Sequence, residues 1–563
     1  MNKEASKSKE KYFFWLIFVA AFGFRFWGLN SFEMQQDPAL NSMRALGWFD
    51  FLVGVGQTSP LVWFGHIPWW GNLSFHDHPP VSFFLQFLTF KIFGDHTFTA
   101  FLPFLLAGVL TAAAIFIFIK KFKTFSAAFF SALLFAFSSY SVWASRTGYL
   151  EGLELFFIIL SILFLLSYVF YKKSKYLYYW AAAATLAVLT KYTAIFLFPA
   201  AILFLLLSER RVFKTKAFLL SLILILVILA PVIVYNIEVF LARGHFDAAF
   251  SSMVGMKPQD YEVLSYREVN VDVFGNLKGI FEVLRQNLSI PYFITFLFGL
   301  GWALFKIIKR KADNLILLLV LNLLLMFLMF AFSGAGARFL GITTPFLSIL
   351  TVLGFLDALE YLKKFATARK LLISIGVLVL AFELFFSVNT NILKRPVLSS
   401  NYFYSPDRFY SHGFEEMDRF FRKEILGPFP KLKRTTVLTD ETTTHDLKNR
   451  DAILVDERAD WFSRVWYVDR YVYYYNSPFV YFSDLNRAAA QGKAGIFELL
   501  RKAGARSTWL VIAKGDNIVS REKNSYNDLL VALSEKLEQD AIAPVREIRD
   551  YKGQVVFAIY HVK

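Results

Sequence analysis

The sequence predicts a polytopic α-helical membrane protein that ends in a soluble α/β domain. Of its 563 residues, 56% are hydrophobic and 66 are Phe, and the mean hydropathy is +0.46. Apolar runs of roughly twenty residues, the length that crosses a bilayer, recur over the first two-thirds of the chain. From about residue 394, polar helical patterns alternate with short strand patterns at 435–439, 452–456, 508–513 and 555–562, which indicates a small α/β domain.

The composition excludes several classes of protein. The formal net charge is +16, but the Lys and Arg residues form short clusters beside apolar runs. The positive-inside rule and anionic headgroups account for such clusters, so we expect a bilayer and no nucleic acid as partner. Cysteine is absent, which excludes disulfides, Cys-ligated zinc and thiol catalysis. No small-residue cleavage site follows the first apolar run. We therefore predict that this run is a retained membrane helix.

The alternation of basic clusters with apolar runs predicts eleven crossings, within a fold of about 11–13 transmembrane helices. The basic N-terminus is expected inside, and a hairpin of two crossings is expected over 177–207. The other crossings are predicted at 12–29, 98–119, 126–144, 150–171, 217–235, 289–305, 315–332, 339–361 and 371–389. All basic clusters then lie on one side, and the unusual polar turns lie on the other.

Two long outer loops follow from this topology. Residues 30–98 form the first, in which the apolar stretch 79–93 is too short for a crossing and is expected along the interface. Residues 236–288 form the second and are expected to be partly helical. The predicted domains are therefore a transmembrane domain, 1–393, and an extracytoplasmic α/β domain, 394–563.

The outer turns carry acids, cations and histidines that plain loops do not need. Cations there can hold a phosphate, and a carboxylate can take a proton from an attacking hydroxyl, which suits a reaction on a phosphate-bearing lipid. The candidate residues are Asp37, His76, Asp77, His78, Arg146, Glu151, Glu154, Lys191, Arg243, His245 and Arg338.

Each candidate in the first loop also has a structural interpretation. Asp37 before Pro38 is a good N-cap for the helix that follows, a role compatible with chemistry. On an extended segment, His76 and His78 would present both imidazoles on one face and could hold a metal with Asp77. Three residues without a fourth are a weak ligand set, so no metal residue is assigned and a divalent cation remains an open alternative.

The later candidates also allow two interpretations each. Glu151 fits an interfacial carboxylate at a helix start. Glu154, one turn deeper, is costly unless partnered, so physical reasoning alone favours it as the functional acid, with Arg146 as a partner for either. Lys191 and Arg338 either extend to headgroups or form a phosphate site, and we weigh these equally.

The aromatic residues are assigned to structure first. Trp63, Trp69 and Trp70 fit an interfacial aromatic belt, with sugar stacking as the second interpretation. The run RVWYVDRYVYYY, residues 464–475, is predicted to be a strand in the core or facing the membrane rather than a ligand site.

Several motifs in order resemble one family of enzymes. RFWGLN is followed by an early acid, by HPP before an apolar stretch, and then by SRTGYLEGLELFF, LAVLTKYTAIFLFPA and ARFLGITTPFLSIL. Over roughly residues 12–361 this set resembles the GT-C membrane glycosyltransferases, in the branch of protein O-mannosyltransferases and lipid A aminoarabinose transferases.

The resemblance implies an inverting glycosyltransferase that uses a polyprenyl-phosphate sugar as donor on the outer face of the cytoplasmic membrane. The acceptor would be a lipid, a glycan or a protein. Asp37 takes the place of the catalytic base, and Glu151 that of a second acid, which overrides the physical preference for Glu154. Lys191 and Arg338 would contact the donor phosphate.

The remaining candidates receive broader roles. Arg146 is grouped with the phosphate-binding cations, and the substrate-contacting residues would be His76, Asp77, His78, Glu154, Arg243 and His245. Two departures from the family pattern concern the acids: Pro38 follows Asp37 where the family usually has Glu, and residue 151 is Glu where it usually has Asp. The first departure puts a shared metal site in question.

Two other classes of function compete with this one. A transporter or flippase of lipid-linked sugars would favour internal repeats and polar sites at mid-membrane, whereas this chain has no evident repeat and its acids gather at outer helix ends. A non-catalytic membrane scaffold would not need acids and cations concentrated on one set of turns.

Overall fold

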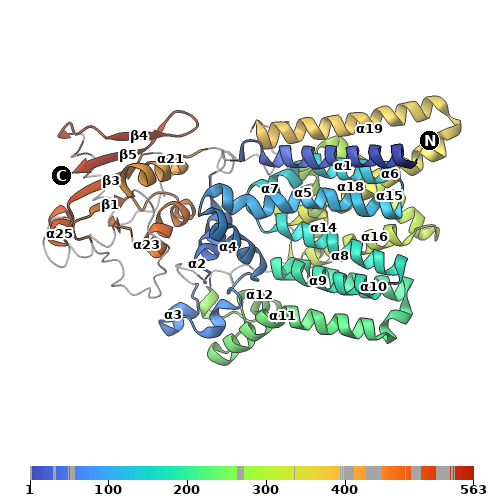
Figure 1. Cartoon of the computed structure of the whole chain (residues 1–563), viewed down its shortest axis with the longest axis horizontal. Coiled ribbons are helices and arrows are strands. Elements are labelled where there is room, and N and C mark those ends of the chain that lie inside the picture. The colour runs from blue at the N-terminus through green and yellow to red at the C-terminus, as the bar shows by residue number, and fades with distance from the viewer. Residues whose placement is uncertain are drawn as a thin grey trace. The chain divides into compact units, whose positions relative to one another are not determined.

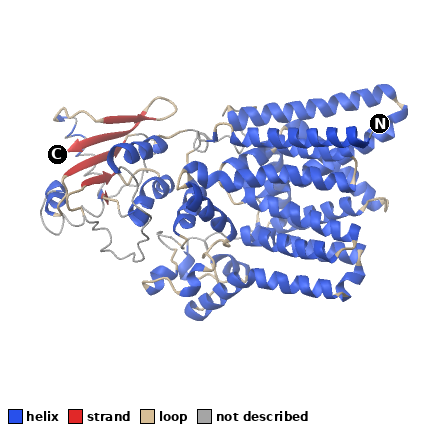
Figure 2. Ribbon diagram, viewed as in Figure 1, coloured by secondary structure: helices blue, strands red, loops and turns tan. Residues whose placement is uncertain are grey.

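The computed structural model is mainly helical, with one small sheet near the C-terminus (Figure 2). It describes residues 3–29, 33–48, 50, 57–262, 272–334, 336–393, 395, 397, 411–426, 447–475, 477–482, 496–514, 533, 535, 537 and 539–562. The chain divides into two compact units. The helical unit comprises Met1–Leu29, Val53–Gln57 and Leu73–Ser405, and the mixed unit comprises Asn30–Leu52, Thr58–Asn72 and Pro406–Lys563.

Long helices that run side by side, joined by shorter ones, make up the helical unit (Figure 1). They are α1 (Lys3–Phe26), α4 (Val81–Phe93), α5 (Thr97–Phe122), α6 (Phe125–Phe137), α7 (Ser139–Arg146), α8 (Glu151–Tyr171), α9 (Ser174–Thr190), α10 (Leu197–Ser208), α11 (Lys216–Arg243), α12 (Ala248–Met253), α14 (Val273–Asn287), α15 (Ile290–Ile308), α16 (Asn314–Ser333), α17 (Ala337–Leu340), α18 (Thr344–Tyr361) and α19 (Ala366–Ser387). The 3₁₀ turn η3 (Tyr192–Phe196) joins α9 to α10.

The prediction of a polytopic membrane protein is confirmed. Among the described residues, seven helical stretches are long and apolar enough to cross a membrane, and the bent pair α6–α7 makes an eighth. The other three predicted crossings lie on α1, which carries charges at both ends, and on the shorter helices α9 and α10. The stretch 79–93 contains only α4, a short apolar helix that starts directly after Pro79 and Pro80, as expected.

Ion pairs at one end of the bundle support the predicted alternation of helix direction. Lys120 at the end of α5 pairs with Glu10 near the start of α1. Lys123 pairs with Asp313, which caps the start of α16. The sequence places all four residues in segments on the same side of the membrane, and the pairs show that these segments do meet.

The interior of the bundle is close-packed around α5, which contacts α1, α4, α6, α7 and α8. Small residues allow the backbones of α15 and α18 to approach. A Cβ atom on Gly299 would lie 2.8 Å from the carbonyl oxygen of Leu350. Such contacts take the place of the hydrophobic effect, which drives little helix association inside a bilayer.

A break between α6 and α7 bends the chain by 57°. It leaves the first N–H groups of α7 without helical partners, which is costly in an apolar environment. Glu383 of α19 compensates, because its Oε1 accepts from the N–H of Ser139 at 2.9 Å. Its Oε2 accepts from the N–H of Ser289, the N-cap of α15, at 3.2 Å. One buried acid thus joins the starts of two helices to α19.

The mixed unit combines part of the first predicted loop with the C-terminal residues. From the loop come α2 (Gln36–Gly47), α3 (Pro60–Phe64) and the 3₁₀ turn η2 (Trp69–Asn72). The prediction placed the whole of 30–98 in the transmembrane domain, but contacts assign 30–52 and 58–72 to the C-terminal residues. No local sequence pattern records this association.

A five-stranded sheet of order β2-β1-β3-β5-β4 forms the core of the mixed unit. Its strands are β1 (Asp451–Val455), β2 (Phe479–Tyr481), β3 (Ser507–Ala513), β4 (Arg546–Arg549) and β5 (Val555–Val562). β1 pairs in parallel with β2 and β3, whereas β5 is antiparallel to β3 and β4. The apolar patterns predicted β1, β3 and β5; they did not predict the short strand β2 or the charged strand β4. The strand predicted at 435–439 lies outside the described residues.

The prediction of a strand over 464–475 is wrong. The run forms α22 (Trp461–Arg464), the π-helical turn η11 (Val465–Asp469) and α23 (Arg470–Tyr475). Aromatic residues favour strands, but that preference is weak and packing overrides it. Here Tyr467, Tyr471 and Tyr475 follow one another at intervals of four, which places them on one helical face, and all three are buried.

Candidate functional site

A buried carboxylate holds two cations from different helices. Glu151 starts α8, and its Oε1 lies 2.5 Å from Lys191 Nζ and 3.2 Å from Arg338 Nε. Lys191 follows the end of α9, and Arg338 lies in α17. The Glu151 side chain is 2% exposed, while Lys191 and Arg338 are 11% and 22% exposed. The structure therefore brings together three of the predicted site residues and leaves the cations partly accessible.

Aromatic rings hold the same two cations from the side. Lys191 Nζ lies 4.1 Å from the centre of the Phe339 ring. The Arg338 guanidinium lies between two rings, 4.9 Å from the centre of Tyr149 and 4.9 Å from that of Phe339. Cations favour the faces of aromatic rings, most strongly where water is excluded. The rings fix the position of each charge without neutralising it.

Glycines allow the backbone around Glu151 and Arg338 to close. A Cβ atom on Gly152 would lie 2.5 Å from the carbonyl oxygen of Ala144, so the end of α7 reaches the start of α8 only because residue 152 is glycine. A Cβ atom on Gly341 would lie 1.5 Å from the ring of Tyr140. That ring places the Tyr140 hydroxyl to donate to the carbonyl oxygen of Arg338.

Glu154 lies one turn further along α8 and is fully buried. Its Oε1 accepts from the Thr193 hydroxyl at 2.6 Å. Its Oε2 has no hydrogen-bond partner among the residues that the structure describes. The sequence offered Glu151 and Glu154 as rival acids. Of the two, Glu151 holds the cations and Glu154 lies beneath them.

The contacts of Arg146 point toward α1. Its Nη1 donates to the carbonyl oxygen of Phe24 at 2.8 Å, and its side chain is buried. The nearby Arg25 donates to the hydroxyls of Ser141 and Ser145. The ion pairs described for Glu151 are with Lys191 and Arg338, and pairing of Arg146 with that acid stays a prediction.

Asp247 organises the turn next to Lys191. Its Oδ2 accepts from the Tyr192 hydroxyl at 3.0 Å and from Asn236 Nδ2 at 3.0 Å, and its Oδ1 caps α12 through the N–H of Phe250. Burial raises the pKa of Asp247, although these donors act against the rise. Sequence reasoning missed Asp247, yet Asp before AAF is a recognisable helix-capping signal.

The HDH motif does not adopt the extended shape that placed both imidazoles on one face. The chain bends at residues 76–78. The buried His76 ring stacks on Tyr261, with 5.5 Å between the ring centres. Both imidazoles lie beside Asp77: His78 Nδ1 is 3.1 Å from Asp77 Oδ1, and His76 Nε2 is 3.9 Å from Asp77 Oδ2. Pro79 and Pro80 prevent the segment from continuing as a strand. Among the described residues, no group of three or more His, Asp or Glu side chains is arranged to hold a metal.

Arg243 and His245 share an acid that the sequence did not single out. Arg243 pairs with both oxygens of Asp260, at 2.7 and 2.8 Å, and His245 Nε2 lies 2.9 Å from Asp260 Oδ2. The edge of the His245 ring packs on Tyr261, the residue on which His76 stacks. The second predicted loop is thus joined to the HDH segment.

Asp37 lies in the mixed unit, in the first turn of α2. The helix begins at Gln36 with Gln35 as its N-cap, so the predicted N-cap role of Asp37 is wrong. Of the loop tryptophans, Trp69 is exposed and Trp70 is buried.

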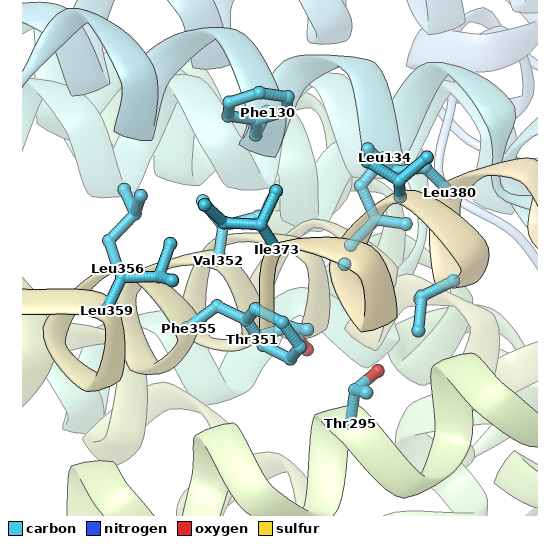
Figure 3. Close-up of a pocket in the computed structure, with 13 residues that line it drawn as sticks. Phe130, Leu134, Thr295, Thr351, Val352, Phe355, Leu356, Leu359, Ile373 and Leu380 are labelled. Carbon is cyan, nitrogen blue, oxygen red and sulfur yellow. The ribbon is translucent and has the colours of Figure 1, made fainter. Parts of the chain in front are cut away.

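An apolar cavity of about 180 Å³ lies between α6, α15, α18 and α19 (Figure 3). Its wall is hydrocarbon apart from the hydroxyls of Thr295 and Thr351. None of the predicted site residues lines it. A cavity of this composition suits a hydrocarbon chain better than a polar reaction.

Comparison with known proteins identifies the fold. The crystal structure of ArnT from Cupriavidus metallidurans in the apo state matches 99% of this chain and 98% of its own, with a TM-score of 0.53 and 12% identity. The same protein bound to undecaprenyl phosphate matches with a TM-score of 0.51 and 11% identity, over 100% of this chain and 98% of its own. The chain has the fold of the GT-C membrane glycosyltransferases, as the sequence predicted.

A more specific likeness covers the first helices. Residues 77–235 match the family model described as dolichyl-phosphate-mannose-protein mannosyltransferase. YycA of Bacillus subtilis (strain 168), whose name assigns it a mannosyltransferase activity provisionally, is 31% identical over 154 residues. That match spans 26% of this chain and 22% of the relative's length. The segment that the family model matches, residues 77–235, contains Glu151 and Lys191, whereas Asp37 and Arg338 lie outside it.

Proposed function

We propose that the protein transfers a sugar from a polyprenyl-phosphate donor to an acceptor hydroxyl or phosphate in a lipid, glycan or protein. The reaction would take place on the outer face of the cytoplasmic membrane. The observation that carries this proposal is the pairing of Lys191 and Arg338 with one oxygen of the buried Glu151.

The charges of this cluster suit the change that such a reaction makes. A polyprenyl-phosphate sugar is a phosphodiester with one negative charge, and the departing lipid phosphate carries a second. Two cations against one carboxylate leave one net positive charge for the phosphate. Groups fixed in advance, as these are by Phe339 and Tyr149, stabilise developing charge without reorganising during the reaction.

The proposed transfer is a direct displacement at the anomeric carbon of the sugar. For a hydroxyl acceptor, the oxygen attacks the anomeric carbon, the bond from that carbon to the phosphate oxygen breaks, and the lipid phosphate leaves with the bonding electrons. Asp37 takes the hydroxyl proton, and the configuration at the anomeric carbon inverts. The assignment of Asp37 as the base rests on the family resemblance. Glu151 acts through the cations that it holds. The contacts proposed for Arg146, His76, Asp77, His78, Glu154, Arg243 and His245 remain predictions.

The test is transfer by the purified protein in liposomes that contain a polyprenyl-phosphate sugar. Asp37→Asn keeps the shape of the side chain and removes its basicity, so turnover should fall by a factor of about 10²–10⁴. Unchanged turnover would remove Asp37 from the mechanism. Assays with EDTA and with added divalent cations decide whether a metal takes part.

The same assay separates transfer from transport. A transferase releases polyprenyl phosphate and forms a glycosylated acceptor, both detectable by mass spectrometry. A transporter or flippase moves the intact donor between leaflets and leaves its mass unchanged. Donor that changes leaflet without losing its sugar would favour the transporter.

A further inference from the structure

The segment that carries Asp37 folds with residues that follow it by several hundred positions. We propose that the C-terminal α/β domain positions Asp37 for catalysis, an inference that rests on the base role proposed above. The domain would then be part of the catalytic apparatus rather than an appendage for binding the acceptor.

The first anchor lies four residues before Asp37. The Glu33 carboxylate is 8% exposed. It accepts from the N–H groups of His412, Gly413 and Glu415 at 2.7, 3.1 and 3.1 Å, and from the Ser411 hydroxyl at 3.1 Å. These donors surround the start of α21 (Phe414–Phe420). Four donors on one carboxylate fix both its position and its orientation.

A second anchor follows at the next residue. The N–H of Met34 donates to the Tyr467 hydroxyl at 2.9 Å, and that hydroxyl donates to Glu415 Oε2 at 3.0 Å. Tyr467 is fully buried. Its hydroxyl, which belongs to η11, thus links the backbone before α2 to a side chain of α21. The entry to α2 is thereby held at two successive residues.

The backbone directly before Asp37 is strained. Gln36 has φ of 52°, in the left-handed region that side chains other than Gly, Asn and Asp rarely adopt. Such a conformation is unfavourable and persists only where the surrounding structure imposes it. The anchors at Glu33 and Met34 on one side, and α2 on the other, impose it here. The backbone conformation of Gln36 therefore sets the orientation of Asp37 relative to the preceding segment.

The other end of α2 is fixed by Tyr474. Its hydroxyl donates to the carbonyl oxygen of Met43 at 2.8 Å. A Cβ atom on Gly47 would lie 2.2 Å from Cε1 and 2.4 Å from Cζ of that ring, so the helix reaches Tyr474 only because residue 47 is glycine. Asp37 is therefore bracketed by contacts with the C-terminal residues on both sides.

The experiment exploits the contact between Gly47 and Tyr474 in the full-length protein. Gly47→Ala favours the helix itself but drives α2 away from Tyr474. Because a misplacement of 1 Å can cost a hundredfold in rate, we expect kcat to fall by about 100-fold. The KM for the donor should not change, because Lys191 and Arg338 belong to the helical unit. The shorter side chain of Tyr474→Leu in the double variant should restore most of the rate.

A matched control identifies the collision as the cause. Tyr474→Phe keeps Cε1 and Cζ, so the combination of Gly47→Ala with Tyr474→Phe should remain slow. If Gly47→Ala does not fold, Tyr467→Phe replaces it. That variant removes the acceptor of the Met34 N–H and the donor to Glu415, and it too should lower kcat at constant donor KM.

Three outcomes would overturn the inference: a normal kcat in Gly47→Ala, a loss that Tyr474→Leu does not reverse, or a loss confined to the donor KM. In the Tyr467→Phe version, normal kinetics would overturn it. Asp37→Asn, assayed beside these variants, separates the two levels of proposal. An active Asp37→Asn defeats the proposed base role, whereas an inactive Asp37→Asn with a normal Gly47→Ala defeats only the positioning role.

Discussion

The ring of Tyr140 occupies the space that a Cβ atom on Gly341 would need, at 1.5 Å from its nearest ring atom. Tyr140 also donates to the carbonyl oxygen of Arg338. The position of one cation in the candidate site thus depends on a ring from α7, the short helix that Glu383 fixes at the break after α6.

Gly341→Ala should therefore weaken the use of the donor. The added methyl group displaces Tyr140 and releases the backbone of Arg338, and overpacking of this kind costs ~1–3 kcal/mol. We expect kcat/KM for the donor to fall about tenfold. Gly301→Ala on α15, where a Cβ atom would meet no atom within 4 Å, is the matched control and should leave transfer unchanged. Equal effects in the two variants would contradict the prediction.

Arg338→Ala should reduce transfer more severely. It removes one of the two cations proposed to bind the leaving phosphate, and loss of one such group costs about 100-fold in rate. Arg338→Lys keeps the charge but lacks the planar guanidinium that lies between Tyr149 and Phe339. Its rate of transfer should therefore lie between those of the wild type and Arg338→Ala. Arg285→Ala makes the same change of charge at an exposed pair with Glu282, and steady-state rates of this variant should match those of the wild type.

The two acids of α8 should respond differently to amide substitution. Glu151→Gln leaves Lys191 and Arg338 without their shared carboxylate, and breaking a buried ion pair costs about 3–5 kcal/mol. Glu154→Gln can keep the bond from Thr193 and adds a donor where Oε2 has no partner among the described residues. We expect a large loss of stability and transfer in Glu151→Gln and a small one in Glu154→Gln. Thermal unfolding and initial rates measure both, and the reverse order would restore Glu154 as the functional acid.

The anchorage of α2 should depend on pH through Glu33. Burial raises the pKa of Glu33 to about 7 from the ordinary value of 4.5, although donors from Glu415, His412 and Ser411 act against the rise. A folded-state pKa above the unfolded value means that the stabilisation is complete below pH 4.5 and is lost as the pH rises through 7. Integrated over this range, the effect is about 3 kcal/mol.

Unfolding of the full-length protein, followed between pH 4.5 and 8, measures this effect. Glu33→Gln should abolish the part of the pH dependence that centres near pH 7. Glu416→Gln, at a surface pair with Arg546, should retain it. A stability profile that Glu33→Gln does not alter would show that another group titrates in this range.

The sequence carried enough information for the bundle and for one cluster. Lys191, Arg338 and Glu151 each stand at the end of an apolar run, and charge alternation assigns all three ends to one side. Lengths and periodicities do not report which rings will face a cation. The positions of Tyr149 and Phe339 around Arg338 therefore followed only from the structure.

Other parts of the site depended on contacts that no local pattern encodes. Asp247 and Asp260 were missed because single acids in a polar segment resemble ordinary solvated residues, although the helix-capping position of Asp247 was readable. The HDH prediction failed because it assumed an extended chain, whereas the segment bends at 76–78, so that His76 stacks on Tyr261 and both imidazoles lie beside Asp77. The association of Glu33 with residues 411–415 joins distant parts of the chain, beyond the range of any periodicity.

That association has a consequence for biosynthesis. Ser411 lies 378 residues after the carboxylate that it contacts. On a ribosome, the segment around Asp37 emerges early and must wait, without its anchors, until residues 411–474 have been made. The proposed base would then be the last residue of the site to reach its position. A partly synthesised chain would have its membrane helices but no catalytic activity.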